Sequence, residues 1–151
     1  KPYYHHTEIG YNYRMSNELA AIGIGQMEVI EDRIKRTREI NEMYRKEVGD
    51  LFYGFQEERE TDRSNMWLTC AIMKGEDKPE DLIAHLEKDN IEARRIWKPM
   101  HEQPVMSKYQ KYINGNSSLL FLQGICLPSG SDLTNKDMKR IIKSIKTFFD
   151  K

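Results

Sequence analysis

Apolar residues recur at steps of three to five positions over the first third of the chain, and this period predicts one long helix over residues 16–49. The recurring positions are Leu19, Ile22, Met27, Ile30, Ile34, Tyr44 and Val48. Ser16 suits the N-terminal cap, and Glu18 places a negative charge near the positive end of the helix dipole. Acidic residues precede basic residues by four positions along the polar face, so we expect this face to be solvated.

The remaining two thirds of the chain alternate between strand and helix signals. Residues 67–73 predict a buried strand, Pro79 opens an amphipathic helix, and residues 91–96 predict a second strand. Thr134 caps a last helix, with Asp137 completing part of a capping box. Helices and strands alternate without a long parallel series, which favours an α+β domain.

This pattern divides the chain into three parts. Residues 1–15 have no helical period and form a segment that leads to an interface or a site, residues 16–49 form the long helix, and residues 50–151 form a small α+β domain. The fold class is therefore α+β: one long N-terminal helix is followed by a small mixed sheet packed under helices.

Composition and charge exclude several classes of function. The 24 Lys and Arg residues balance 24 Asp and Glu residues, so no global positive field draws the chain to nucleic acid. The longest apolar runs, such as residues 119–122, are too short to span a membrane. Cys70 and Cys126 stand in short apolar runs typical of buried thiols, without disulfide or zinc spacing, so we expect a cytoplasmic protein without a metal site.

Asn12 and Arg14 are candidate phosphate ligands. In an extended segment, residues two apart project to the same side, which places an amide donor beside a guanidinium. A turn asparagine and a surface arginine are the alternative, and spacing alone favours it.

In the expected long helix, Gly23 and Gly25 are interpreted as small residues that let another backbone approach closely.

A chemically mixed loop between two prolines is the second candidate. Its aromatic plane, ammonium, thioether and imidazole suit a ligand wall, although a purely structural loop is equally compatible with the sequence. The loop consists of Trp97, Lys98, Pro99, Met100 and His101. No complete catalytic set occurs at a recognisable spacing in these 151 residues.

Three segments together resemble the DegT/DnrJ-type nucleotide-sugar aminotransferases. The first is Gly-Tyr-Asn-Tyr-Arg-Met-Ser-Asn at 10–17 with the small residues that follow it, the second is Trp-Lys-Pro-Met-His at 97–101 with Gln-Pro-Val at 103–105, and the third is Gly-Ile-Cys-Leu-Pro-Ser-Gly-Ser at 124–131. The last two look most like the branch that aminates UDP-linked 4-keto-6-deoxy-N-acetylhexosamines in glycan or polysaccharide biosynthesis.

The resemblance implies a fold-type I transferase that depends on pyridoxal 5'-phosphate, uses glutamate as amino donor, and forms a homodimer with active sites at the subunit interface. It implies that this chain is the C-terminal part, and that the large domain with the lysine that bonds to the cofactor lies upstream. By the same resemblance, Asn12 and Arg14 serve the cofactor phosphate or substrate of the neighbouring subunit, and residues 97–101 line the nucleotide-sugar pocket. No catalytic residue is assigned within these residues.

Two positions depart from the pattern of that branch, which often has proline where Arg95 stands and an acidic residue where Ser118 stands. An additional cation at Arg95 would suit a different phosphate or acid group. The alternative to the aminotransferase is a stand-alone α+β interaction or regulatory module that docks through its long charged helix.

Overall fold

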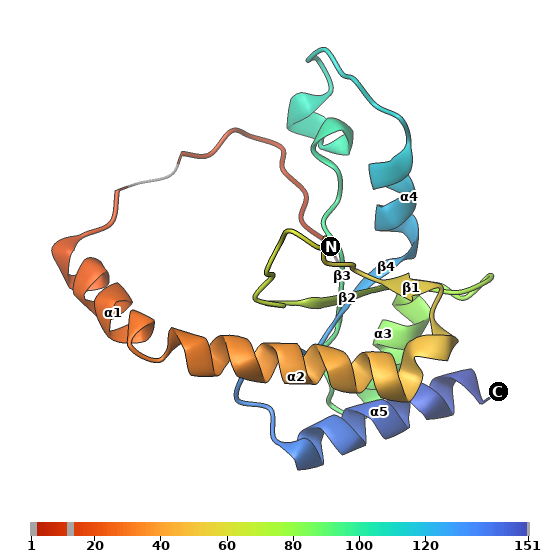
Figure 1. Ribbon diagram of the computed structural model, residues 1–151. Coiled ribbons are helices and arrows are strands. Elements are labelled where there is room, and N and C mark those ends of the chain that lie inside the picture. The colour runs from red at the N-terminus through yellow and green to blue at the C-terminus, as the bar shows by residue number, and fades with distance from the viewer. Residues whose placement is uncertain (1–2, 12–13, 151) are drawn as a thin grey trace.

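The computed structural model describes residues 3–11 and 14–150, and a small sheet lies at its centre (Figure 1). Every neighbouring pair of its described strands is antiparallel, so the sheet is not mixed as expected. The hydrophobic pattern specifies which face of a strand is buried, but not the direction of its neighbour. In spatial order the strands are β1 (Gly54–Phe55), β2 (Thr69–Ile72), β4 (Gly124–Leu127) and β3 (Arg94–Arg95).

Three helices pack together with one face of the sheet and enclose the core: α2 (Ile30–Val48), α3 (Pro79–Lys88) and α5 (Asn135–Phe149) (Figure 1). Ala71, Ile125 and Leu127 belong to this core together with apolar side chains of all three helices. Pro79 is the first residue of α3, and Thr134 with Asp137 forms a complete capping box on α5, as predicted. The α+β class is confirmed.

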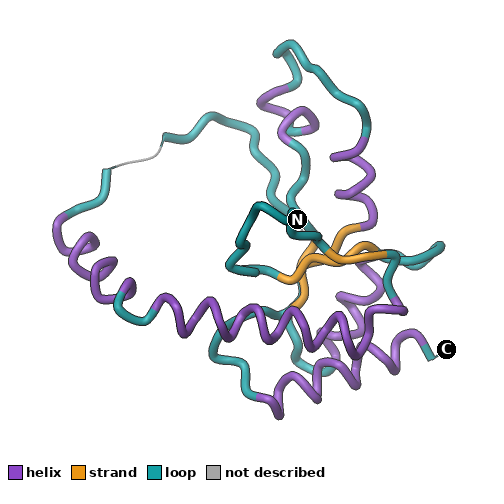
Figure 2. Tube along the Cα trace, viewed as in Figure 1, coloured by secondary structure: helices purple, strands orange, loops and turns teal. Residues whose placement is uncertain are grey.

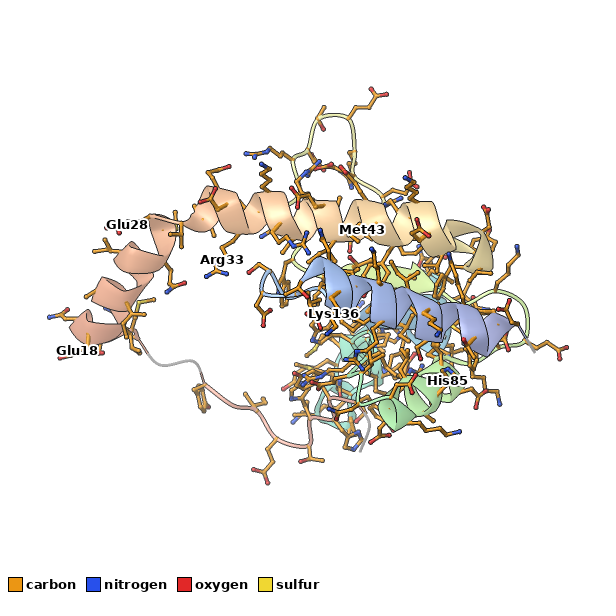
Figure 3. All side chains as sticks on the ribbon, turned by 90° about the horizontal axis from the view of Figure 1, so that it is seen from below. Glu18, Glu28, Arg33, Met43, His85 and Lys136 are labelled. Atoms are coloured by element: carbon orange, nitrogen blue, oxygen red, sulfur yellow. The ribbon has the colours of Figure 1, made fainter. Side chains whose placement is uncertain are left out.

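The first part of the expected long helix is a separate element, α1 (Asn17–Met27), which the structure separates from α2 at Glu28 and Val29. Figure 3 shows α1 extending beyond the rest of the structure, between the labelled Glu18 and Glu28. The Ser16 side chain accepts from the Leu19 amide at 3.4 Å, so the predicted cap is confirmed. None of the residues of α1 is buried, so tertiary packing does not hold it in line with α2.

The close approach expected at Gly23 and Gly25 is not found within the described residues. Apart from the adjacent residues and the backbone of α1 itself, no described atom lies within 4 Å of the position that a Cβ would take at either glycine. The small residues of α1 therefore face open space in this chain. The apolar side chains Leu19, Ile22 and Met27 are each more than half exposed.

The charged face of α2 is used for contacts within the chain. Arg38 pairs with Glu58 at 2.9 Å, and Arg33, labelled in Figure 3, donates to the Ser131 hydroxyl at 3.2 Å. These contacts join α2 to the connection between β1 and β2 and to the turn that precedes α5. Part of the surface that the interaction-module alternative needs is therefore already occupied.

The chain from β3 to the last strand rises away from the sheet and returns as α4 (Asn116–Gln123), as Figure 2 shows. Gly115 precedes α4 with a φ of 85°, which favours glycine. Gly124 starts β4 where a Cβ would stand 2.5 Å from both the Ile96 side chain and the Leu120 carbonyl oxygen. A side chain at this position would collide with both groups, so glycine is needed where α4 passes into β4 beside Ile96.

Candidate functional site

The candidate loop 97–101 follows directly from β3, with only Ile96 between them. Pro99, with a φ of −55° and a ψ of 140°, precedes a 3₁₀ turn over Met100–Glu102, and a second turn spans Pro104–Met106. Short turns that begin beside proline restrict the backbone, because the proline ring fixes φ. The loop is thus a shaped connection between the sheet and α4.

Gln103 joins this loop to the N-terminal segment. Its side chain accepts from the His6 amide at 3.0 Å and donates to the Tyr4 carbonyl at 3.2 Å and, more weakly, to the Lys98 carbonyl at 3.4 Å. Only 2% of Gln103 is exposed, and the Val105 amide adds a bond to the His6 carbonyl. Sequence reasoning missed this role, because a glutamine beside proline carries no periodic signal of burial.

One cavity, of about 640 Å³, lies between the sheet, the N-terminal segment and the loop. The Trp67 and Trp97 rings lie 5.9 Å apart on its wall, and both side chains are exposed. Aromatic faces and a few polar groups suit a planar ligand that carries charge. Its lining also includes Tyr4, His6, Arg94, Arg95, Cys126 and Pro128.

A second cavity, of about 400 Å³, lies on the far side of the loop. Pro99, Met100 and His101 line it together with aromatic residues of the segment that precedes α4, including Tyr109 and Tyr112. The five predicted loop residues therefore do not share one wall: Trp97 lines the first cavity, and Pro99, Met100 and His101 line the second.

Lys98 stands between these two groups in the sequence and lines neither cavity. Its ammonium lies 5.3 Å from the centroid of the Tyr3 ring, a cation–π contact. Lys98 thus contacts the N-terminal segment by its side chain, while its carbonyl accepts from Gln103.

His101 is tied to α4. Its Nε2 lies 3.2 Å from the Ser118 hydroxyl, which donates to a Glu102 carboxylate oxygen at 2.5 Å. Because the hydroxyl hydrogen is directed to Glu102, the imidazole donates to the serine oxygen and does not act as its base. The cluster orients His101 beside the second cavity and is not a Ser-His-Glu nucleophile.

Arg95 lines the first cavity, but its guanidinium is engaged by contacts within the fold. Its guanidinium pairs with Glu80, donates to the Phe121 carbonyl, and lies 4.3 Å from the centre of the Phe121 ring. Only 8% of the side chain is exposed. Of the three guanidinium nitrogens of Arg95, Nε is the one without a hydrogen-bond partner among the described residues. The arginine that stands where the related branch often has proline therefore links β3 to α3 and α4.

Of the two candidate phosphate ligands, only Arg14 belongs to the described residues, and it is not brought together with the loop. Asn12 lies outside the described residues. Arg14 is exposed, belongs to the segment that precedes α1, and lines neither cavity. Within residues 3–11 and 14–150 it makes no ion pair or hydrogen bond, so its guanidinium is available to an anion.

Over the described ranges, no three His, Cys, Asp or Glu side chains converge as a metal site would require. None of the helices in the same ranges has both the length and the apolar character to cross a bilayer.

Comparisons with known proteins agree with the resemblance of the motifs. A putative pyridoxal phosphate-dependent aminotransferase, EpsN of Bacillus subtilis, is 39% identical over 97% of this chain and 39% of its own length. A GDP-perosamine synthase of Escherichia coli O157:H7 is 37% identical over 97% of this chain and 40% of its own length. The chain thus spans about two fifths of the length of these relatives.

The fold agrees as well. The crystal structure of a DegT DnrJ EryC1 StrS aminotransferase from Brucella abortus superposes with a TM-score of 0.80 at 24% identity, over 98% of this chain and 39% of that one. The match to the DegT/DnrJ/EryC1/StrS aminotransferase family spans residues 1–146, almost the whole of this chain. The chain therefore belongs to the DegT/DnrJ/EryC1/StrS aminotransferase family.

Proposed function

We propose that the protein containing this chain transfers an amino group from glutamate to a nucleotide-linked 4-keto sugar in bacterial glycan or polysaccharide biosynthesis. The observation that carries the proposal is the family match over residues 1–146. The two cavities beside the loop 97–101 support it, because their aromatic and polar lining suits a ligand with a planar base and a sugar. This chain would supply part of the substrate wall.

The finer proposal names the substrate as a UDP-linked 4-keto-6-deoxy-N-acetylhexosamine. It is supported by the resemblance of residues 97–105 and 124–131 to that branch of the family, and by a cavity in the size range of small-ligand sites. A relative in Campylobacter jejuni, 23% identical, is named for a UDP-linked amino sugar. A GDP-linked 4-keto sugar is the competing substrate, because a more similar relative is a GDP-perosamine synthase.

The cofactor in this proposal is pyridoxal 5'-phosphate, which supplies an electron sink for amino transfer when it is bound. Arg14 fits part of its site: the guanidinium is exposed, has no partner among the described residues and suits a phosphate. The described lysines are exposed or half-buried, so none has the apolar enclosure that a lysine bonded to the cofactor needs. We propose that this lysine belongs to the remainder of the protein.

We also propose a homodimer in which Asn12 and Arg14 reach the cofactor phosphate or substrate of the other subunit. Support comes from α1, which directly follows this segment and exposes apolar side chains along its length. Exposed apolar surface of this kind marks an interface, either with a partner subunit or with the rest of the protein.

A cytoplasmic location fits the two free cysteines.

Arg14→Ala in the full-length protein should weaken cofactor retention by about ten-fold to a hundred-fold, because a charge-assisted phosphate contact contributes roughly 1.5 to 3 kcal/mol. Equilibrium dialysis against the cofactor measures this loss. Mixed dimers with a subunit that lacks the cofactor-bonding lysine test the interface: activity recovers if Arg14 acts across it. Absence of recovery contradicts the shared site and leaves the family assignment unaffected.

The function itself is tested by incubating the full-length protein with its cofactor, ¹⁵N-glutamate and a nucleotide 4-keto sugar. The proposal predicts an amino sugar that carries the isotope, with a higher kcat/KM for the UDP-linked N-acetylhexosamine than for a GDP-linked 4-keto-6-deoxyhexose. A preference for the GDP-linked sugar would correct the substrate. Failure to label either sugar, while the protein retains its cofactor, would contradict the function.

A further inference from the structure

Two cysteines face each other at the centre of the sheet. Cys70 of β2 lies directly opposite Cys126 of β4, and their sulfur atoms are 3.6 Å apart. The Gln56 amide donates to the Cys70 carbonyl at 3.0 Å, so the backbone polar groups of Cys70 are directed to β1. The two cysteines therefore form a pair without backbone hydrogen bonds between them, the arrangement that brings facing side chains closest.

The register in the adjacent part of the ladder agrees with this arrangement. The Met73 amide donates to the Gln123 carbonyl at 2.9 Å, and these residues stand directly opposite each other in the same register. Hydrogen-bonded and non-bonded pairs alternate along an antiparallel ladder, so three positions from Met73 the pair at Cys70 is non-bonded. In such pairs the Cα atoms are about 4.5 Å apart, within the range that disulfides span.

Both thiols lie on the sheet face that the helical core does not cover. Ala71 and Leu127 belong to the core, whereas Cys70 and Cys126 do not. Cys126 is buried but lines the first cavity, and Cys70 is half-buried. A small reagent that enters the cavity therefore meets Cys126, whose sulfur lies 3.6 Å from that of Cys70.

The pair also differentiates its two thiols. The hydrogen bond with Cys126 lowers the pKa of Cys70, against the smaller opposing effect of burial. The same contact, together with burial, raises the pKa of Cys126. These directions favour Cys70 as the first thiol to react, and the 3.6 Å separation places the second sulfur within reach of it.

We propose that Cys70 and Cys126 form a reversible oxidation site that hydrogen peroxide converts to a cross-strand disulfide. The Cys70 thiolate attacks one peroxide oxygen, the O–O bond breaks, and the leaving hydroxide takes a proton to become water. The Cys126 sulfur then attacks the sulfenic acid on Cys70, the S–S bond forms and the S–O bond breaks. The second hydroxide leaves with the Cys126 proton, so the dithiol loses two electrons and peroxide becomes two waters.

The test uses the full-length protein with its cofactor, treated with hydrogen peroxide, alkylated and digested for mass spectrometry. The expected result is one cross-linked peptide pair that contains Cys70 and Cys126, has lost two hydrogens, and is restored by dithiothreitol. Cys126→Ser should stop the reaction at a sulfenic acid on Cys70, and Cys70→Ser should leave Cys126 reduced. Free thiols at both positions, or a disulfide between protein molecules instead, would overturn the proposal.

A second probe makes the test independent of any folding defect in the variants. Phenylarsine oxide bonds to two neighbouring thiols with release of water, so the wild-type protein should bind one equivalent at Cys70 and Cys126. A ten-fold excess of simple monothiol should not displace it, whereas a small dithiol should. If the arsenical fails to attach to this pair in the native protein but attaches after urea denaturation, the sites are closed and the proposal is wrong.

Discussion

Replacing Gln103 by methionine should release the N-terminal segment from the candidate loop. Methionine keeps a similar length and apolar stem, but it removes the acceptor for the His6 amide and the donors to the Tyr4 and Lys98 carbonyls. The bonds at 3.0 Å and 3.2 Å are well formed, and the one at 3.4 Å is weak. Two partly buried hydrogen bonds contribute about 2 kcal/mol in net terms.

This change should open the segment locally, because the helical core does not depend on it. A loss of about 2 kcal/mol corresponds to a roughly thirty-fold change in an opening equilibrium. The His6 amide should therefore exchange its hydrogen about thirty-fold faster in Gln103→Met, as measured by native-state hydrogen exchange. The KM for the nucleotide sugar should rise as well, because Tyr4 and His6 line the first cavity.

Gln110→Met is the matched control, since Gln110 is exposed and bonds to the Tyr112 hydroxyl at 2.6 Å on the surface. It should leave exchange at His6 unchanged. If Gln103→Met exchanges at the rate of the wild type, the side chain does not hold the segment. An increase at core amides of α5 as large as that at His6 would show general destabilisation, and would also refute the local role.

Two further predictions concern stability. Thr134→Ala should remove the bond that the Thr134 hydroxyl accepts from the Asp137 amide, while the bond from the Thr134 backbone amide to the Asp137 carboxylate remains. The free energy of unfolding should fall by about 1 kcal/mol in urea denaturation; an unchanged midpoint would show that the threonine side chain contributes nothing. The side-chain hydrogen bond from Arg38, and then the backbone bond from Ser64, lower the pKa of Glu58, so its charged form stabilises the folded state above the unfolded-state pKa of about 4.3. Glu58→Gln should therefore lower the urea midpoint at pH 7, and the difference from the wild type should shrink as the pH falls through the lower folded-state value; a constant difference would contradict this.

The sequence predicts elements whose signals are local. Ser16 and the pair Thr134 and Asp137 cap helices through bonds to residues three positions away, and Pro79 starts α3 because its ring presets the backbone. These features depend on a few consecutive residues. They were therefore predictable without knowledge of the tertiary structure.

Features that depend on distant contacts were not predictable. None of the residues of α1 is buried, and α1 is separate from α2. The period of apolar residues continues across both helices, so it does not reveal this separation. Gln103 acts through residues almost a hundred positions away in sequence, and Arg95 acts through Glu80 and Phe121. Residues 97–101 do leave the sheet as a loop, as expected, but the pattern of residue types does not encode the turn at Met100 or the division of these residues between two cavities.

The most direct test of the proposed role of the loop is the effect of His101→Ala on the two half-reactions of the full-length protein, followed separately by stopped-flow absorbance. The two half-reactions share the cofactor, but only the one that consumes the nucleotide sugar requires the residues proposed to line the sugar pocket. We expect the KM for the nucleotide sugar to rise while the glutamate half-reaction keeps nearly its wild-type rate. His85→Ala, at a histidine on α3 that bonds to the Ser144 carbonyl, is the control and should leave both halves unchanged. Equal loss in both half-reactions of His101→Ala would contradict a substrate-binding role for this loop.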